Sequence, residues 1–212
     1  HYWSLPGYSW DACLKETKVE LELITGNNEN MYLFIENAIR GGVSMIAHRH
    51  AVANNGVGSD VTKPASYLGY FDINNQYGWA MSQSLPTGNF RWLDEAEVKA
   101  FTPEAIVDID DDSDTGYIFE VDLDYPEHLH DVHNALPLAP ERMVVTKEMY
   151  SPYAASFDHD FAPSEKLVPN LFDKTNYVKH FRNAEFYIEH GLKVTKVHRI
   201  LSFTQSPWMK KI

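Results

Sequence analysis

Apolar residues recur along the chain with two spacings, and each spacing predicts a different element. The stretch from Met31 to Ile39 is apolar with helical spacing, and Gly41 stands where a helix-ending residue with a left-handed backbone belongs. Aromatic and apolar residues fill the run from Tyr67 to Phe71, which predicts a buried strand with Asp72 at its tip. Helices and strands that mix without regular alternation predict an α+β fold.

Capping residues, glycines and apolar alternation predict the other elements. The helices run from a cap at Ser9 through Leu14, from a cap at Asn74 or Asn75, from Asp94 to Phe101, from the start Thr102-Pro103-Glu104, and from Asn183 to His190 before Gly191. The strands are Val43 to Ala47, Gly116 to Leu123, Tyr177 to Phe181 and Val194 to Phe203, and a loop lies between Pro137 and Pro140.

The charge of the chain is unevenly distributed. Its apolar fraction of 44% and aromatic fraction of 13% can supply a core. The net charge is −12, and residues 94–165 hold 3 basic and 19 acidic residues, whereas residues 166–212 hold 9 basic and 3 acidic ones. Screening limits charge effects to about 10 Å at ordinary salt, so a polyanion could meet the basic stretch and avoid the acidic one. The acidic stretch is otherwise interpreted as a solvated face.

Two features bear on the compartment. No run approaches the roughly 18 apolar residues that a membrane helix needs, and no signal-peptide pattern opens the sequence, so no membrane partner is expected. The single cysteine, Cys13, cannot form an internal disulfide, which indicates an intracellular, reducing compartment: nuclear, viral or cytoplasmic. Cys13 lies on a short apolar helix face and is interpreted as a core residue rather than a nucleophile.

The segment around Asp72 is the main candidate for chemistry. A carboxylate at a strand end, before a tight turn into a helix, can hold a divalent ion together with a backbone carbonyl such as that of Ile73. Mg²⁺ usually binds one or two carboxylates plus substrate phosphates, so Asp72 needs a partner elsewhere. Tyr77 follows five residues on, where the helix turns it back over the site. Spacing alone leaves open that Asp72 is a surface helix cap and Tyr77 a core residue.

Residues 67–81 resemble motif A of family B DNA polymerases, whose pattern is Asp-x-x-Ser-Leu-Tyr-Pro starting at Asp72. The string looks like the version in protein-primed polymerases of linear plasmids, viruses and Maverick or Polinton transposons. Gln76 stands where the pattern has an apolar Leu. Upstream, residues 39–42 are similar to the Tyr-x-Gly-Gly linker of protein-primed members, which joins exonuclease to polymerase domains and touches the template strand. Ile39 replaces its tyrosine.

A third resemblance lies downstream and extends the match over nearly the whole chain. It covers residues 116–123 through 138–141, and residues 166–171 through 205–206. This stretch looks like the region between motif A and the fingers, where protein-primed members carry an extra insertion.

The resemblance implies a partial polymerase palm with the motif A region, followed by an inserted region of the protein-primed type. Residues 1–93 would hold the exonuclease–palm linker and the front of the palm. Residues 94–203 would be the inserted region, acidic to 165 and basic after it, and residues 204–212 would begin the approach to the fingers. The exonuclease acids would lie before His1, and the fingers lysine and the Asp-Thr-Asp motif beyond Ile212, so the fragment is predicted to be inactive alone.

The resemblance also implies roles in catalysis. Two Mg²⁺ ions about 4 Å apart would hold the attacking primer hydroxyl and the leaving pyrophosphate. Asp72 is then the catalytic acid and a metal ligand, and the Ile73 carbonyl assists at the metal. Tyr77 and Ile73 form the nucleotide-binding part, with the Tyr77 ring against the incoming sugar.

DNA contacts are implied for the linker and its surroundings. Gly41 and Gly42 would let the backbone approach a strand closely, while Arg40 and Arg49 would meet phosphates. The implied partners are template and primer DNA, deoxynucleoside triphosphates and a terminal protein primer. The alternative is a non-catalytic, truncated mobile-element relic or a DNA-binding fragment.

Two further patterns have a metal-like appearance. Asp110, Asp112 and Asp114 imitate the start of an EF-hand, although the sixth position is Thr115 instead of Gly and the twelfth is Val121 instead of Glu.

The second pattern is a histidine cluster. His128, His130 and His133 could serve a metal-dependent hydrolase if their side chains converged, although helical zinc ligands prefer a spacing of four. Surface histidines in a polar loop explain them equally well.

Overall fold

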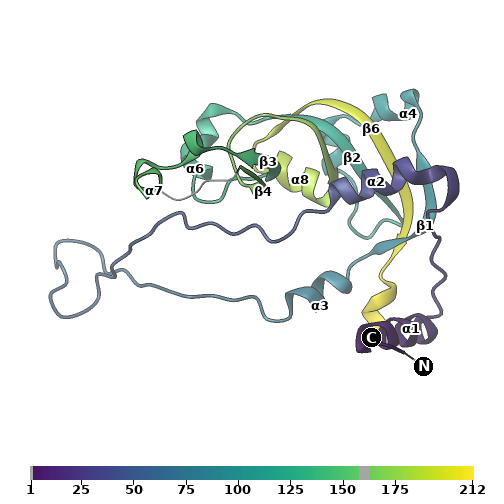
Figure 1. Ribbon diagram of the computed structural model, residues 1–212, viewed down its shortest axis with the longest axis horizontal. Coiled ribbons are helices and arrows are strands. Elements are labelled where there is room, and N and C mark those ends of the chain that lie inside the picture. The colour runs from purple at the N-terminus through teal and green to yellow at the C-terminus, as the bar shows by residue number, and fades with distance from the viewer. Residues whose placement is uncertain (1, 158–162) are drawn as a thin grey trace.

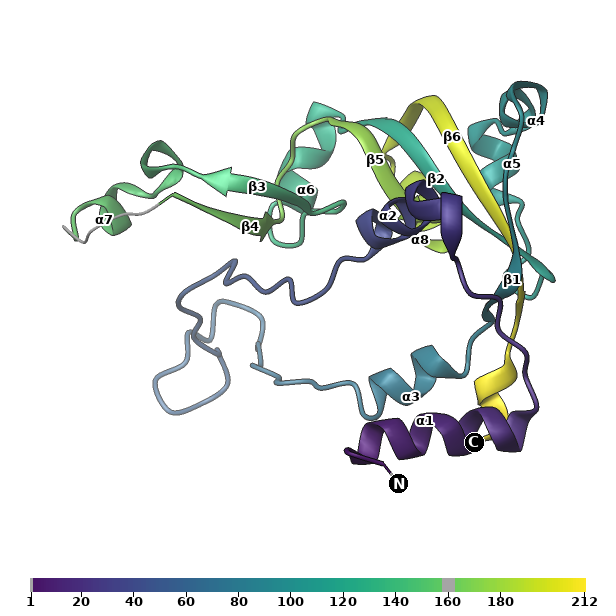
Figure 2. The same ribbon diagram turned by 45° about the vertical axis from the view of Figure 1, so that its right-hand side comes forward.

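The computed structural model describes residues 2–157 and 163–212, and most of its strands form one antiparallel sheet (Figure 1). Four strands pair in the order β1-β6-β2-β5. They are β1 (Leu85–Trp92), β2 (Thr115–Asp124), β5 (Lys174–His180) and β6 (Lys193–Ser206). The sheet curls like half of a barrel (Figure 2), and helices lie on both of its faces, so the α+β class is confirmed.

Strand β6 is one of the two inner strands of the sheet, and its most buried run is covered on both faces. Residues 200–203 are buried one after another. Such a continuous buried run is expected for a strand with packed layers on both faces. The strand pairs with β1 on one edge and with β2 on the other. The sheet draws on all three stretches into which the sequence was divided. Strand β1 lies in residues 1–93, β2 and β5 lie in residues 94–203, and Ser206 of β6, which pairs with Leu85, lies in residues 204–212.

Two hydrophobic cores lie on opposite faces of this sheet. On one face α8 (Phe181–Glu189) packs against β2, β5 and β6, and α5 (Pro103–Val107) packs against α8. On the other face α2 (Glu29–Ala38) lies over β5. The first core is Ile106, Phe119, Val121, Leu123, Tyr125, Ala139, Tyr177, Phe181, Ala184, Tyr187, Leu192 and Ile200, and the second is Phe34, Ile118, Val178, Leu201 and Phe203. Alternate residues of β2 enter opposite cores, as the two-residue period of a strand requires.

Shorter elements surround the sheet. They are α4 (Glu95–Ala100), α6 (His130–His133), α7 (Pro152–Ala155) and the 3₁₀ turns at Gly26–Asn28, Glu127–Leu129 and Lys147–Met149. Strands β3 (Glu141–Val145) and β4 (Ser164–Val168) form a separate hairpin that projects from the sheet (Figure 2). Helix α1 (Leu5–Thr17) packs against the 3₁₀ turn Trp208–Lys211, where the Trp10 and Trp208 rings meet edge to face at 5.9 Å. Cys13 is buried on α1, which confirms its interpretation as a core residue.

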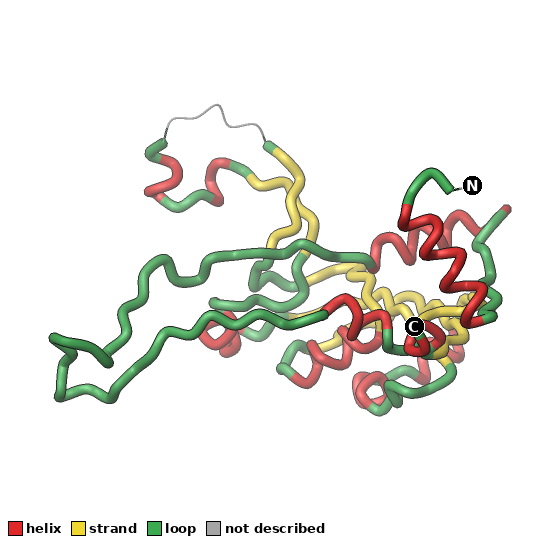
Figure 3. Tube along the Cα trace, turned by 90° about the horizontal axis from the view of Figure 1, so that it is seen from below, coloured by secondary structure: helices red, strands yellow, loops and turns green. Residues whose placement is uncertain are grey.

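Residues 39–75 form a long excursion, called the exposed arm below, between α2 and α3 (Gln76–Met81) (Figure 3). The arm contains no helix or strand, and nearly all of its side chains are exposed. Its tip is organised by Asn54. The Asn54 side chain donates to the carbonyls of Asp60 and Pro64 at 3.1 and 3.0 Å, and it accepts from the Asp60 N–H at 2.7 Å.

Helices with local capping signals are confirmed. The Asp94 carboxylate accepts from two backbone N–H groups at the start of α4 and forms a capping box with Glu97. The Thr102 hydroxyl caps α5 by accepting from the Ala105 N–H at 3.3 Å. Helices α2 and α8 and strands β2, β5 and β6 also lie within a few residues of their predicted positions, and Gly191 closes α8 with a φ of 94°.

Two helix caps differ from the prediction. Helix α1 begins five residues earlier than expected because the cap is Ser4, whose hydroxyl accepts from the Gly7 N–H, and not Ser9. Helix α3 follows Asn75, but the Asn75 side chain makes no capping hydrogen bond.

The strands predicted at residues 43–47 and 67–71 are wrong, since both ranges belong to the exposed arm. Tyr70 and Phe71 are 97% and 93% exposed instead of buried. A strand requires a neighbour for its N–H and C=O groups, and the described residues place no strand beside either range. The assignment of Gly41 is wrong as well, because α2 ends at Ala38 and the left-handed backbone falls on Gly42, with a φ of 72°.

Three strands were not predicted from the sequence: β1, β3 and β4. Strand β1 contains Pro86, Gly88 and Asn89, which are typical turn residues. They are tolerated because β1 pairs with β6 through irregular register at Pro86–Gly88 and Gly88–Arg91.

Candidate functional site

The residues of the motif-A-like segment lie where the exposed arm returns to the body. The Asp72 carboxylate accepts a 2.9 Å hydrogen bond from the N–H of Ile73. Ile73 is 68% exposed and Tyr77, on α3, is 86% exposed. The carboxylate and the phenol ring are therefore both accessible to a substrate.

Helix α3 is held mainly at its C-terminal end. It has six residues and none of them is buried. The Ser82 N–H donates to the carbonyls of Gly78 and Trp79, and the Gln83 side-chain amide donates to the Trp79 carbonyl at 3.1 Å. The side-chain oxygen of Gln83, Oε1, accepts a 3.2 Å hydrogen bond from the guanidinium of Arg182.

The described residues contain no group of three or more His, Cys, Asp or Glu that could hold a metal ion. Asp72 thus offers a single carboxylate. Its donor atom is of the hard oxygen type that Mg²⁺ prefers, so Asp72 fits one position in such a site. The remaining ligands would have to come from substrate phosphates and from another carboxylate.

The three histidines of α6 and its preceding turn do not form a metal group. His130 Nε2 lies 3.2 Å from the Tyr125 carbonyl oxygen, and His133 Nδ1 lies 2.9 Å from the Tyr125 hydroxyl. Both rings therefore serve as hydrogen-bond partners of Tyr125. The convergence that a hydrolase built on His128, His130 and His133 needs is not found among the described residues.

The acidic run at residues 108–114 folds back on its own backbone. The Asp110 carboxylate accepts from the N–H of Asp112 at 2.9 Å. Thr115 and Val121, which occupy the sixth and twelfth positions of the EF-hand pattern, belong to β2. The run is therefore a tight turn that leads into a strand.

The residues predicted to bind DNA all belong to the exposed arm, but Arg40, at its start, is held against the sheet. Arg40 stacks on the Tyr177 ring at 4.1 Å and donates to the Val178 carbonyl at 2.6 Å. Gly41, Gly42 and Arg49 lie on the exposed arm, and a Cβ added to either glycine would meet nothing within 4 Å. No hydrogen bond or ion pair between described residues joins Arg40 or Arg49 to Asp72. The structure thus brings Asp72 and Tyr77 onto one segment but does not gather the basic residues beside them.

Arg40 also forms one wall of a polar cleft of about 590 Å³ between α2, β5 and the β3–β4 hairpin. Three arginines and four glutamates line it, among them Arg142, Arg199 and Glu120.

Burial and the nearby Arg40 charge lower the pKa of Lys179 to about 8. Its ammonium lies 3.4 Å from the Ala38 carbonyl at the end of α2, where a cation complements the helix dipole.

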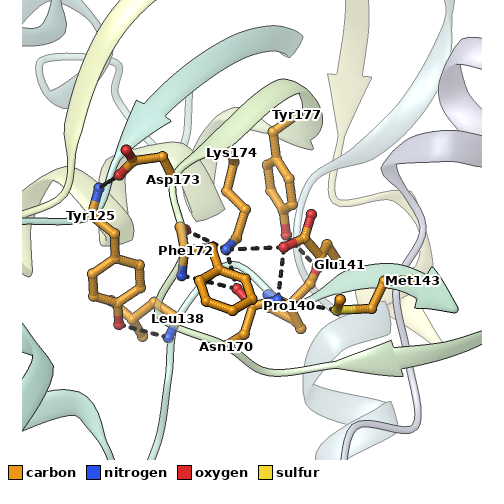
Figure 4. A network of polar contacts seen from close by, with 10 residues as sticks. All are labelled: Tyr125, Leu138, Pro140, Glu141, Met143, Asn170, Phe172, Asp173, Lys174 and Tyr177. Carbon is orange, nitrogen blue, oxygen red and sulfur yellow. Dashed lines mark hydrogen bonds and ion pairs between the residues drawn. The ribbon is translucent and has the colours of Figure 1, made fainter. Parts of the chain in front are cut away.

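A buried lysine network at the base of the hairpin was not foreseen from the sequence (Figure 4). Lys174 is 2% exposed, donates to Asn170 and to the Phe172 carbonyl, and lies 3.3 Å from the Glu141 carboxylate. Burial lowers the pKa of Lys174, and the charge of Glu141 opposes that shift. Asn170 also donates to Glu141 at 2.7 Å. The network fixes the hairpin to β5, and no local pattern around Lys174 marks it as buried.

Comparison with known proteins adds no assignment: no family model, no curated protein and no solved structure matches the chain. Among the described residues, no helix combines the length and apolar character that crossing a bilayer requires.

Proposed function

We propose that the chain is part of a DNA-directed DNA polymerase of family B, of the protein-primed kind of viruses and mobile elements. The supporting observation is the resemblance of residues 67–81 to motif A in a segment that presents Asp72 and Tyr77 openly. Tyr67, Tyr70 and Phe71, just before Asp72, are 76%, 97% and 93% exposed. Contiguous exposed aromatic residues mark a surface that another part of a protein covers. Strands of a polymerase palm would cover them.

In this proposal the reaction is transfer of a deoxynucleotide from its triphosphate to the 3′ hydroxyl of a primer on a DNA template. Asp72 and the Ile73 carbonyl would hold Mg²⁺, which supplies neutralisation of the phosphate charge. Phosphoryl transfer asks mainly for positioning of the reactants. Tyr77 would lie against the incoming sugar, where its ring collides with a ribose 2′ hydroxyl and so discriminates by clash.

The proposal assigns residues 1–93 to the linker and palm front, 94–203 to the inserted region and 204–212 to the approach to the fingers. A two-metal site needs a second acidic strand, whereas Asp72 stands in no metal-holding group of the described residues. The 212-residue chain alone is therefore expected to extend no primer. A terminal protein primer is the further partner that this class of polymerase implies.

Primer extension with a longer polypeptide that adds the fingers lysine and the Asp-Thr-Asp motif tests the proposal. Asp72→Asn should abolish incorporation, while Asp131→Asn, an equivalent change at an exposed acid of α6, should leave it unchanged. Templated incorporation by the 212-residue chain alone, or full activity of Asp72→Asn in the longer polypeptide, would contradict it.

The exposed arm supports one alternative, a DNA-binding fragment or non-catalytic relic. Arg49 is flanked by two histidines and all three are exposed, so the arm could contact phosphates without any chemistry. The reading frame on either side of the 212 codons distinguishes the two functions. An Asp-Thr-Asp motif downstream supports the polymerase, and a stop codon shortly after Ile212 supports the relic.

A further inference from the structure

Helix α3, which carries Tyr77, depends on few contacts for its orientation. A six-residue helix is too short to be stable by itself. Its first turn has no side-chain cap, since Asn75 adopts a left-handed backbone and makes no capping bond. Within α3 only Gly78 is partly buried, and continuous partial burial begins at Ser82 and Gln83, where the chain turns towards β1. The polar contacts of this turn therefore determine the direction of the helix.

Gln83 connects the helix to the body of the protein. Its amide nitrogen donates to the Trp79 carbonyl at 3.1 Å and to the Ser82 hydroxyl at 3.3 Å. Its amide oxygen accepts from Arg182 at 3.2 Å. A single side chain thus joins the C-terminal end of α3 to the first turn of α8.

Arg182 is the rigid end of this connection. It follows Phe181, which is fully buried in the core, and its own side chain is 21% exposed. The Arg182 guanidinium donates to the Asp111 backbone carbonyl at 2.5 Å and forms an ion pair with the Asp111 carboxylate, Nε to Oδ1, at 2.8 Å. The Asp111 carbonyl thus holds the Nη2 group of the guanidinium, while its Nη1 group donates to the side-chain oxygen of Gln83.

We propose that Arg182 is a positioning residue for Tyr77, acting through Gln83 and the C-terminal end of α3. This inference rests on the proposed polymerase function. In that function Tyr77 discriminates between deoxyribose and ribose, and Arg182, on α8, would control how well it does so. The guanidinium also places a positive charge near the C-terminal end of α3, where it complements the helix dipole. The acidic run at 108–114 then has a defined task, since Asp111 orients Arg182.

The first test uses the 212-residue chain and needs no activity. Arg182→Gln should speed amide hydrogen exchange at Trp79 and Ser82, on the order of tenfold, because a charge-assisted hydrogen bond that holds the helix end is lost. Exchange at Phe119, in the core of the sheet, should stay slow. Arg91→Gln removes a different Arg–carboxylate pair, with Glu97 of α4, and should leave exchange at Trp79 unchanged.

A second variant separates this role from a general loss of stability. Gln83→Ala removes the same connection without touching α8 and should reproduce the faster exchange at Trp79. If the core amide at Phe119 also exchanges faster in Arg182→Gln, the exchange rates of Gln83→Ala distinguish a local loss of the connection from a general loss of stability. Unchanged exchange at Trp79 in Gln83→Ala would overturn the inference, whatever the fate of the polymerase proposal.

The second test uses the longer polymerase described above. Arg182→Gln should lower the ratio of kcat/KM for deoxynucleotides over ribonucleotides several-fold, because a misoriented Tyr77 ring excludes the 2′ hydroxyl less well. Arg182→Lys, which keeps the charge but not the fork, should restore only part of the ratio. Loss of all incorporation in the unmodified polypeptide rejects the polymerase function, whereas an unchanged ratio in an active Arg182→Gln enzyme rejects the positioning role alone.

Discussion

The sheet and the exposed arm contain the same kinds of aromatic side chain in opposite surroundings. Phe119 of β2 is fully buried between β6, α5 and α8, whereas Phe71 of the arm is 93% exposed. Both residues lie in short aromatic runs that predict a buried strand. The difference is that β2 has a partner strand on each edge, and the arm has none among the described residues.

This contrast shows that an apolar run specifies a surface to be covered and not the element that covers it. In the sheet, β5, β6 and α8 supply the cover from within the chain. In the arm, Arg40 is held against the sheet at the start, and the tip is organised by hydrogen bonds of Asn54 to its own loop. The proposed function explains the arm by assigning its cover to other parts of a polymerase palm.

The largest expected effect is the difference in free energy of unfolding between an alanine substitution in the sheet and one in the exposed arm. Phe119→Ala should lower the free energy of unfolding by about 3–5 kcal/mol, because it leaves a cavity in a packed core. Phe71→Ala should change it by less than about 0.5 kcal/mol, as is usual for exposed side chains. Urea unfolding of both variants measures this difference. A loss above about 1 kcal/mol for Phe71→Ala would show that the arm packs on the body in solution.

The sequence predicted elements whose causes are local. Asp94 and Thr102 place α4 and α5 because a cap acts within three residues. Strand β1 escaped prediction because Pro86 and Gly88 oppose it locally and only the pairing with β6 overrides them. The strand at 67–71 was wrong for the converse reason, since its local pattern is favourable and its partner is missing from the described residues.

The candidate site divides in the same way. Asp72 and Tyr77 were named from a linear motif, and the structure places both in the open. Arg182, Gln83 and Lys174 escaped notice because their importance arises from contacts with residues that are 33 to 99 positions away in the chain. Spacing along the sequence carries no signal for such contacts.

A second prediction uses pH to probe the packed region. Burial, with the charges of Arg182 and Lys179, lowers the pKa of His180 to about 4. Between about pH 6.5 and 4 the unfolded chain binds a proton that the folded chain does not, so folding stability falls as the pH falls, by up to roughly 3 kcal/mol. His180→Gln should remove this part of the pH dependence of urea unfolding. His48→Gln, in the arm, is the matched control, and an unchanged pH dependence in His180→Gln would contradict the burial of the ring.

A third, smaller effect concerns the starts of two short helices. Asp94→Ala should lower the free energy of unfolding by about 1 kcal/mol, because the capping box of α4 loses its acceptor. Asn75→Gly should change it by less than about 0.5 kcal/mol, since Asn75 makes no capping bond and glycine suits its left-handed backbone. Thermal or urea unfolding measures both. Equal losses would indicate that α3 is capped in solution as α4 is.

The smallest expected effect distinguishes two arginines that the sequence treated alike. Arg49 is exposed on the arm, whereas Arg40 is bound to the Tyr177 ring and the Val178 carbonyl. Binding of single-stranded DNA is expected to be weak and salt-dependent, because it rests on phosphate contacts.

Arg49→Gln should weaken this DNA binding a few-fold and reduce the slope of log affinity against log salt by about 0.7, the value for one phosphate contact. Arg40→Gln should leave the slope unchanged and instead lower stability, because a guanidinium that already holds a ring and a carbonyl is not free for phosphate. Fluorescence titrations at several salt concentrations measure both slopes. A reduced slope for Arg40→Gln and none for Arg49→Gln would mean that DNA enters the polar cleft beside β5 and that the arm serves another purpose.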